Sequence, residues 1–181
     1  MPRPLDLAVL ASMPQAMTIE IRLIERPDVA SFRECLDTVA REKRYLAMFQ
    51  APPHEAVEAF VRRVTDSSSV QWVAVDGTRV VGWADILRHG ADAVTHCGRL
   101  GMGVLPAYRR QGLGRRLLRA AIASAHARGI TRIELDVRSD HAAAIALYEA
   151  EGFSREALKR DALRFDGVRF DAVQMSLLQS T

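Results

Sequence analysis

The chain contains only two cysteines, Cys35 and Cys97, and no long apolar run. Domains held together by disulfides usually carry about four or more cysteines, so that class is excluded, and two isolated thiols fit a reducing cytoplasm. Their spacing matches no metal-binding pattern, so no metal centre is expected and each thiol is predicted to be buried. No apolar stretch approaches the roughly 20 residues that a membrane-spanning helix needs, so no membrane partner is expected.

The chain also has little excess of charge of either sign. The 25 basic and 22 acidic residues leave a net charge of +3, too mild to require a nucleic-acid partner. Apolar residues make up 49% of 181 residues, which excludes a disordered chain and suits one domain with a real core. Residues 1–16, with three prolines, are predicted to be a loose extension. Asp6 interrupts their apolar stretch and argues against an export signal. Residues 17–181 are expected to form the single domain, and Met17 is an alternative start.

Hydrophobic periodicity predicts an α/β fold in which strands and helices are mixed along the chain. Strands are expected over 18–24, 70–75, 79–87, 96–105, 131–138, 153–164 and 168–178. Helices are expected over 28–43, 54–65, 112–128 and 141–151. The dipeptides Asp76-Gly77 and Asp166-Gly167 are typical of β-hairpin turns.

Residues 104–118 carry the strongest chemical signal. An apolar strand leads into a basic loop with two glycines, and a helix then begins. The first N–H groups of a helix have no internal partner, and the helix dipole places partial positive charge there. Gly112 and Gly114 leave room for a diphosphate to approach, and Arg109 and Arg110 add charge. The block predicts a site for a phosphorylated ligand. A solvated basic helix face after an ordinary turn is the alternative.

Two blocks resemble the GNAT N-acetyltransferase superfamily. Residues 109–114, RRQGLG, match its [RQ]-x-x-G-x-[GA] motif, and residues 144–153 resemble its A-I-x-L-Y-x-x-x-G-F helix. The blocks come in the family's order and spacing, and the resemblance covers roughly residues 18–178. It implies a mixed, mostly antiparallel, splayed central sheet flanked by helices, with acetyl-CoA as co-substrate.

The resemblance also implies how the coenzyme is held. The glycine-rich strand over 96–105 would bulge and splay from the next strand, and the pantetheine arm would pair with the backbone of Met102 and Val104. A barrel or sandwich corner would also explain glycines in a strand. The implied coenzyme contacts are Met102, Val104, Arg109, Arg110, Gln111, Gly112, Leu113, Gly114, Arg115, His141, Ala144 and Tyr148.

His141 departs from the family pattern, which usually has Asn there. Imidazole can donate one hydrogen bond but lacks the paired donor and acceptor of an amide. Coenzyme binding is then retained in altered form. Alternatively, His141 only begins a helix, with Asp140 as its natural cap.

Acetyl transfer from a thioester to an amine needs three things: a neutral amine, donors for the oxyanion and a proton for the thiolate. The backbone N–H near Met102 is the oxyanion candidate. Tyr148 matches the tyrosine that acts as general acid in the family. The alternative is an amphipathic tyrosine that only packs against apolar neighbours on a helix. No carboxylate lies in 95–100, so His96 is the nearest base candidate. Glu134 and Asp136 are further candidates, and attack by an already neutral amine needs no base.

Arg44 and Tyr45 are the predicted substrate-binding residues, because an aromatic group among cations suits an amine that carries a carboxylate. A solvated helix end is the alternative. The sequence predicts a cytoplasmic acetyl-CoA-dependent N-acetyltransferase that acts on a primary amine of a small molecule, such as an amino acid, by direct attack in a ternary complex. Two alternatives stay open: a protein N-terminal or lysine acetyltransferase, and a non-catalytic acyl-CoA-binding module. A homodimer also stays open.

Overall fold

The computed structural model describes residues 19–179. The predicted extension over 1–16 and the alternative start at Met17 lie outside the described residues. The elements in chain order are β1 (Glu20–Leu23), α2 (Val29–Arg41), α3 (His54–Thr65), β2 (Val70–Asp76), β3 (Arg79–Arg88), β4 (Cys97–Val104), α4 (Leu113–Ala127), β5 (Arg132–Arg138), α5 (Ala142–Ala150), β6 (Ser154–Phe165) and β7 (Val168–Leu178). Each strand and helix predicted from the sequence is present, with ends that differ by a few residues at most.

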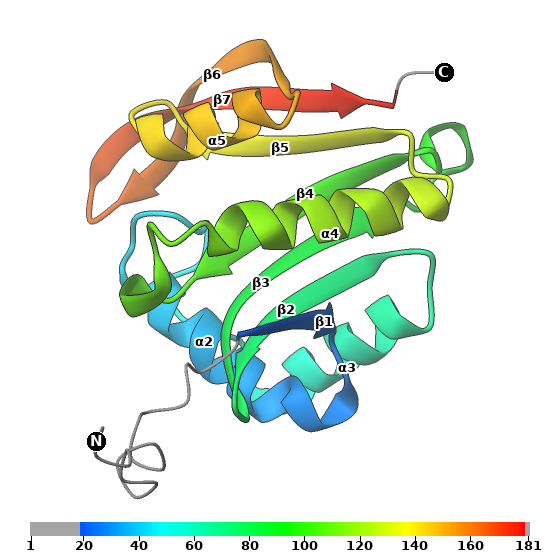
Figure 1. Ribbon diagram of the computed structural model, residues 1–181. Helices are drawn as coiled ribbons and strands as arrows, with labels where there is room; N and C mark the ends of the chain where they lie inside the picture. Colours follow the sequence, from blue (N-terminus) through cyan, green and yellow to red (C-terminus); the bar gives the residue numbers. More distant parts are fainter. Residues whose placement is uncertain (1–18, 180–181) are drawn as a thin grey trace, which may run out of the picture.

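The described strands form one seven-stranded sheet in the order β1-β2-β3-β4-β5-β7-β6 (Figure 1). Neighbouring strands are antiparallel except for β4 and β5, which are parallel. The expected mixed, mostly antiparallel sheet is therefore confirmed. The β6–β7 hairpin turns at Asp166 and Gly167, whose φ angles of 48° and 84° are both positive, as a tight type I′ turn requires.

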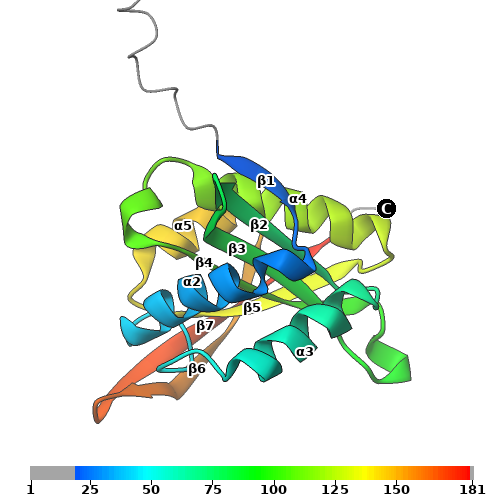
Figure 2. The same ribbon diagram turned by 90° about the horizontal axis from the view of Figure 1, so that it is seen from below.

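Helices cover both faces of this sheet. α4 and α5 lie on one face, and α2 and α3 lie on the other (Figures 1 and 2). Each layer is held by an apolar stripe at helical spacing. In α4 the buried stripe consists of Leu113, Leu117, Leu118, Ala121 and Ala125. Burying one such leucine stabilises the fold by roughly 1.5–3 kcal/mol.

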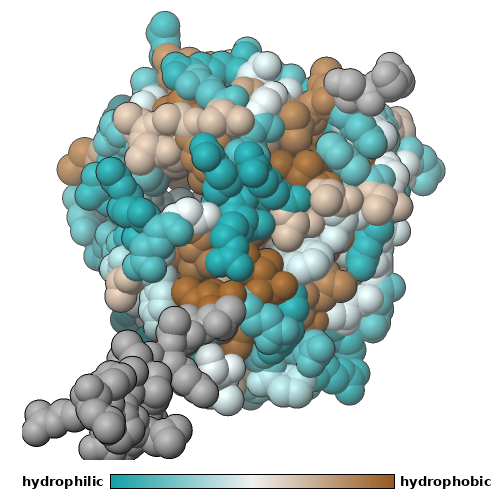
Figure 3. Space-filling view, in the orientation of Figure 1, coloured by the Kyte–Doolittle hydropathy of each residue, from teal (hydrophilic) through white to brown (hydrophobic). Residues whose placement is uncertain are grey.

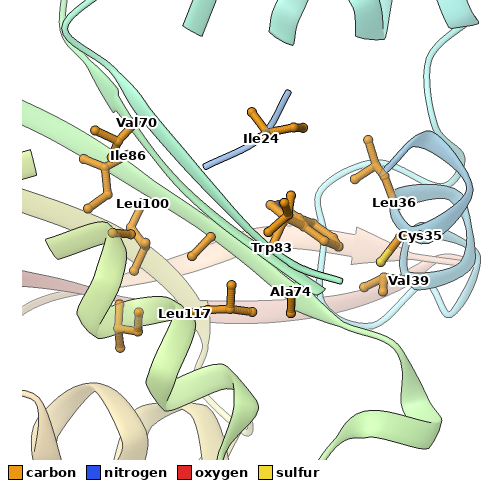
Figure 4. Close-up of a cluster of buried hydrophobic side chains, with 14 of the residues drawn as sticks. Ile24, Cys35, Leu36, Val39, Val70, Ala74, Trp83, Ile86, Leu100 and Leu117 are labelled. Carbon is orange, nitrogen blue, oxygen red and sulfur yellow. The ribbon is translucent and has the colours of Figure 1, made fainter. Parts of the chain in front are cut away.

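The core therefore has two apolar layers with the sheet between them (Figure 4). Trp83 of β3 points toward α2, where its ring lies 5.7 Å from that of Phe32, edge to face. Leu117 of α4 lies on the opposite face, against Gly82 of β3. Cys35 and Cys97 are both buried, as predicted.

β4 and β5 separate soon after they begin. Their pairing consists of Cys97 with Arg132, Gly98 with Ile133 and Arg99 with Glu134. Beyond Arg99, β4 continues along β3, and β5 continues along β7. The splay expected of this strand is thus present in the fold.

The bulge expected in β4 is absent. Pairing of β3 with β4 runs without interruption from Gly82–Val104 to Arg88–Gly98. The glycines of β4 instead make room for side chains of β3. A side chain at Gly103 would overlap the ring of Trp83, and one at Gly101 would press on the carboxylate of Asp85. Close approach of neighbouring side chains therefore explains these glycines.

On the face seen in Figure 3, hydrophobic groups form separate patches among hydrophilic ones. Among residues 19–179, no helix is long and apolar enough to span a bilayer.

Candidate active site

A cleft of about 1160 Å³ opens where β4 and β5 part. Its walls come from both strands, the start of α4, one side of α5, residues 44–47 and part of β6. Most residues that the sequence singled out meet here. They are Arg44, Tyr45, Met102, Val104, Arg109, Arg110, Gly112, Leu113, Gly114, Arg115, His141, Ala144 and Tyr148. Gln111 and His96 are not among the lining residues.

The backbone of β4 offers free hydrogen-bonding groups to this cleft. The N–H of Leu105 donates to Val81, and the N–H of His89 donates to Cys97. Hydrogen-bonded pairs alternate along an antiparallel ladder, so β4 residues in step with these two bond to β3. Met102 and Val104 are out of step, so their N–H and C=O groups face the gap toward β5, where the carbonyl of Val104 accepts a hydrogen bond from Arg109.

The start of α4 forms one end of the cleft. Gly112 is its N-cap residue and has a φ of 75°, a left-handed conformation that favours glycine. Gly114 follows in the first turn. A Cβ at Gly114 would lie 3.5 Å from Met102 and 3.9 Å from Leu147, which are ordinary contacts. The protein alone could therefore accommodate a side chain at Gly114, whereas the space in the cleft would shrink.

The arginines of the loop differ in their partners. Arg109 donates from Nε to the carbonyl of Val104 (2.7 Å) and forms a two-pronged ion pair with Glu42. Arg115 pairs with Glu151 (3.0 Å). Arg110 has no ion-pair partner among residues 19–179. Arg109 thus fixes the loop, and Arg110 retains a charge that is free to meet a ligand.

Gln111 holds the loop from outside the cleft. Its side-chain amide donates to the carbonyl of Ala107 at 3.1 Å. Tyr108 adds a second anchor, because its hydroxyl donates to Asp76 at 2.7 Å. The loop before α4 is therefore pinned to β2 and to its own backbone.

Tyr148 of α5 lines the cleft with only 8% of its surface exposed. Its ring packs against Phe153, with centroids 5.7 Å apart. Burial raises the pKa of Tyr148 to about 12, so the phenol is protonated at neutral pH. Among the described residues its hydroxyl has no hydrogen-bond partner, which leaves the proton available to a ligand.

His141 stands at the N-cap position of α5 and lines the cleft. Its ring stacks on Tyr45, with centroids 4.8 Å apart. Burial, aided by the charge of Arg44, lowers the pKa of His141, so its imidazole is neutral at pH 7. The expectation that Asp140 caps this helix is wrong. No side chain caps α5, and Asp140 pairs instead with Arg138, whose Nε lies 2.8 Å away.

The three base candidates lie in different surroundings. His96 is exposed in the turn before β4, and its carbonyl accepts the N–H groups of Thr131 and Arg132. Six residues of extended chain separate it from Met102, a distance of roughly 20 Å. Glu134 bonds to His89 (3.1 Å) and does not line the cleft.

Asp136 does line the cleft, between Arg99 (2.5 Å) and Lys159 (2.8 Å). Burial alone would raise the pKa of Asp136, but hydrogen bonds from Lys159 and Arg99 outweigh it and hold the pKa below its ordinary value. Asp136 is therefore ionised at neutral pH.

Sequence reasoning missed two groups. Asp85 of β3 is a buried carboxyl within an apolar strand, and burial raises its pKa to about 7. Its only sequence signal is a charged residue inside the apolar run over 80–87. The second group is a set of cations from β4, β5 and β6 that line the cleft, namely Arg99, Arg138, Lys159 and Arg160. Within residues 19–179, no three His, Cys, Asp or Glu side chains are grouped to hold a metal ion.

The model of the acetyltransferase (GNAT) family matches residues 34–153. The chain belongs to this family. Of the curated members, the [ribosomal protein bS18]-alanine N-acetyltransferase of Escherichia coli K12 is 51% identical over 53 residues, 29% of this chain and 36% of that protein. The N-alpha-acetyltransferase RimI of Mycobacterium tuberculosis is 38% identical over 97 residues, 54% of this chain and 60% of that protein. The matches thus span about a third to three fifths of these relatives.

Solved structures of the family share the fold. A GNAT-family acetyltransferase from Streptococcus pneumoniae superposes with a TM-score of 0.84 at 27% identity, covering 89% of this chain and 99% of that one. The ribosomal-protein-S18-alanine N-acetyltransferase of Escherichia coli gives 0.69 at 26% identity, covering 91% and 96%. The Salmonella typhimurium acetyltransferase yncA, solved with acetyl-CoA, gives 0.84 at 21% identity, covering 90% and 94%.

Proposed function

We propose that this protein is an acetyl-CoA-dependent N-acetyltransferase. The observation that carries the proposal is the gap between β4 and β5, which exposes free backbone groups of β4 directly beside the N-terminus of α4. A ligand with an extended amide-containing arm and a diphosphate matches both features at once.

The coenzyme is assigned to the α4 side of the sheet. Its diphosphate meets the first N–H groups of α4, with Arg110 as the free counter-charge. Its pantetheine arm pairs with the backbone of Met102 and passes His141 and Ala144 on α5. The carbonyl of Val104 is already engaged by Arg109, which leaves the N–H of Val104 for the arm.

The reaction is assigned to the point where the arm reaches Tyr148. The amine nitrogen attacks the thioester carbonyl, the C–N bond forms and the C–S bond breaks. The N–H of Met102 stabilises the oxyanion, and Tyr148 donates to the departing thiolate. An acceptor that arrives as an ammonium ion loses two protons in total. One ends on the thiol, and the other must leave through the protein or the solvent.

The acceptor is assigned to the other end of the cleft, between residues 44–47 and the β6–β7 hairpin. Lys43, directly before residues 44–47, forms an ion pair with Asp166 at the tip of the hairpin, with Nζ 2.7 Å from Oδ1. The names of the curated relatives specify an alanine of a ribosomal protein and an α-amino group. They favour the α-amino group of a protein N-terminus over the small amine that the sequence favoured.

The charges that line the cleft further restrict the class of acceptor. Arg44 and Arg160 line the cleft and have no ion-pair partner among the described residues, and Asp136 is the one lining carboxylate, already held by two cations. Like charges repel in such a site, and opposite charges attract. An N-terminal sequence with acidic residues next to the α-amine is the acceptor class that fits best.

A panel of amines with acetyl-CoA tests this, with thiol release as the readout. The panel holds an Ala-Asp-Asp peptide, an Ala-Arg-Arg peptide, an N-blocked lysine peptide and free alanine. We expect the acidic peptide to give the highest kcat/KM. A preference for free alanine would favour a small-molecule amine as the acceptor. Coenzyme binding with no thiol released in the presence of any of these amines would indicate a non-catalytic module. Gly114→Glu serves as the coenzyme-free control.

A further inference from the structure

Residues 42–45 directly follow α2 and lie at the acceptor end of the cleft, near the tip of the β6–β7 hairpin (Figures 1 and 2). Lys43 has a φ of 48°, a left-handed conformation that is uncommon outside glycine, so the helix ends here and the chain turns. Its Nζ pairs with Asp166 of the hairpin at 2.7 Å. Glu42, the C-cap residue of α2, pairs with Arg109 of the loop before α4. The segment is therefore tied to two different walls of the cleft.

The other two residues of the segment contact β5 and α5. The carbonyl of Arg44 accepts a hydrogen bond from Arg138 at the end of β5 (3.5 Å). The ring of Tyr45 stacks on that of His141, the N-cap residue of α5, with centroids 4.8 Å apart. Arg44 and Tyr45 both line the cleft where the acceptor is assigned. The residues that face the acceptor are thus positioned by elements to which the coenzyme is assigned.

Arg109 makes the most direct connection between the two ends of the cleft. Its Nε donates to the carbonyl of Val104 at 2.7 Å, and the N–H of the same residue is assigned to the pantetheine arm. Its other two nitrogens donate to the two carboxylate oxygens of Glu42. Its guanidinium carbon lies 4.9 Å from the ring centroid of Tyr45. All three nitrogens are engaged and the group stacks on an aromatic ring, so little of it is left for a diphosphate.

We propose that Arg109 and Glu42 are positioning residues that couple the acceptor site to the coenzyme site. This role rests on the proposed acetyltransferase activity. An arm that pairs with Val104 orders the strand residue that Arg109 holds, and Arg109 in turn holds Glu42 and Tyr45. An acceptor that binds next loses less conformational freedom in ordering residues 42–45. Each ligand therefore binds more tightly when the other is present, because coupling between two sites is reciprocal.

Glu42→Gln tests the coupling, because it removes the charge of the pair while Glu42 itself does not line the cleft. The measurement is the Kd of the Ala-Asp-Asp peptide by calorimetry, with and without saturating coenzyme A, which carries no acetyl group to transfer. In the parent, coenzyme A should tighten peptide binding by about tenfold, within the range usual for coupled sites. In Glu42→Gln this coupling factor should fall to near unity, while the Kd for acetyl-CoA does not rise.

Steady-state kinetics gives a second readout. The KM for the peptide should rise by about tenfold in Glu42→Gln with kcat largely kept, since no reacting group is changed. Arg109→Gln should show the same split between KM and kcat. The double variant should lose no more than Arg109→Gln alone, because the two residues act as one unit. Arg110→Gln should show the opposite pattern, with weaker acetyl-CoA binding and the coupling factor retained.

Glu156→Gln is the matched control. Glu156 forms a two-pronged ion pair with Arg132, at 2.9 and 2.5 Å, and neither residue lines the cleft. The side chains of this pair are about as exposed as those of Glu42 and Arg109. The control should keep the parent's coupling factor and peptide KM. Equal losses in Glu42→Gln and Glu156→Gln would mean that both substitutions act through the fold, which contradicts the proposal.

The remaining outcomes separate the two proposals. A Glu42→Gln variant with the parent's coupling factor and peptide KM overturns the coupling and leaves the acetyltransferase assignment standing. A rise in the acetyl-CoA Kd of Arg109→Gln as large as that of Arg110→Gln would make Arg109 a ligand of the coenzyme and would also overturn it. A parent protein that binds acetyl-CoA yet neither binds nor acetylates any amine of the panel overturns both.

Discussion

At the scale of single residues, the surroundings of Asp136 and Asp85 shift the pKa values of these two aspartates in opposite directions. Asp136 sits between Arg99 and Lys159 and is held ionised, whereas Asp85 has no ion pair among residues 19–179 and lies in an apolar layer. The pKa of the first is lowered, and that of the second is raised to about 7. The same chemical group is therefore held charged beside two cations and favours its neutral form in an apolar layer.

The pKa of Asp85 also predicts how stability changes with pH. Its folded-state pKa of about 7 exceeds the unfolded value of 3.8, so the folded state binds more protons between these two values. The free energy of unfolding should therefore fall as pH rises through this window. Asp85→Asn removes the ionisation and should be more stable than the parent above pH 7, by at most about 4 kcal/mol. Urea unfolding of both proteins at pH 4 and pH 8 measures this. A variant that is less stable at pH 8 would contradict the raised pKa.

Tyr148 allows a second prediction at this scale. Tyr148→Phe removes one hydroxyl that has no protein partner in the described residues, so packing against Phe153 should be kept. We expect kcat to fall by about 10²–10⁴-fold, with little change in the Kd for acetyl-CoA. Steady-state kinetics and calorimetry on the same preparation measure both. A kcat equal to the parent's would leave Tyr148 as a packing residue.

At the scale of elements, the junction between β4 and α4 carries the coenzyme assignment. Gly114→Glu places bulk and negative charge in the first turn of α4, where a diphosphate is expected. The Cβ itself makes only ordinary contacts, so the fold should survive. We expect loss of acetyl-CoA binding by calorimetry with an unchanged circular dichroism spectrum. Gly90→Glu is the matched control, since Gly90 is exposed and nothing lies within 4 Å of its Cβ position. Full affinity in folded Gly114→Glu would overturn the phosphate site.

The elements themselves could be predicted from the sequence because their signals are local. Alternation within β3 and the 3.6-residue period of α4 mark each one, and Asp166-Gly167 marks a hairpin. The reason for the β4 glycines is not local. It depends on which side chains β3 presents across the ladder, and these are Asp85 and Trp83. For the same reason the sequence could not show that Asp85 faces Gly101, because that contact depends on the register between β3 and β4.

At the scale of the whole molecule, the described chain consists of two parts joined by a short stretch of pairing between β4 and β5. β1–β4 with α2, α3 and α4 form one part, and β5–β7 with α5 form the other. β4 and β5 share pairs at three positions, beginning with Cys97 and Arg132. Ion pairs also connect the two parts, because Arg115 and Arg119 of α4 both pair with Glu151, which follows α5. A coenzyme bound in the cleft would contact both parts and so add to the interactions that hold them together.

This arrangement predicts that acetyl-CoA stabilises the protein strongly and in a particular place. Saturation at about 100 times Kd adds roughly 2.7 kcal/mol, because the ligand binds the folded state alone. For a domain of this size the Tm should rise by roughly 5–10 °C. Since the coenzyme bridges the gap, amide hydrogen exchange should slow most in β4, β5 and α5, and least in β1 and α3. Thermal unfolding and hydrogen exchange with and without acetyl-CoA measure the two effects, with Gly114→Glu as the variant that should show neither. Protection spread evenly over the sheet, or a Tm rise retained in Gly114→Glu, would place the coenzyme somewhere other than the gap between β4 and β5.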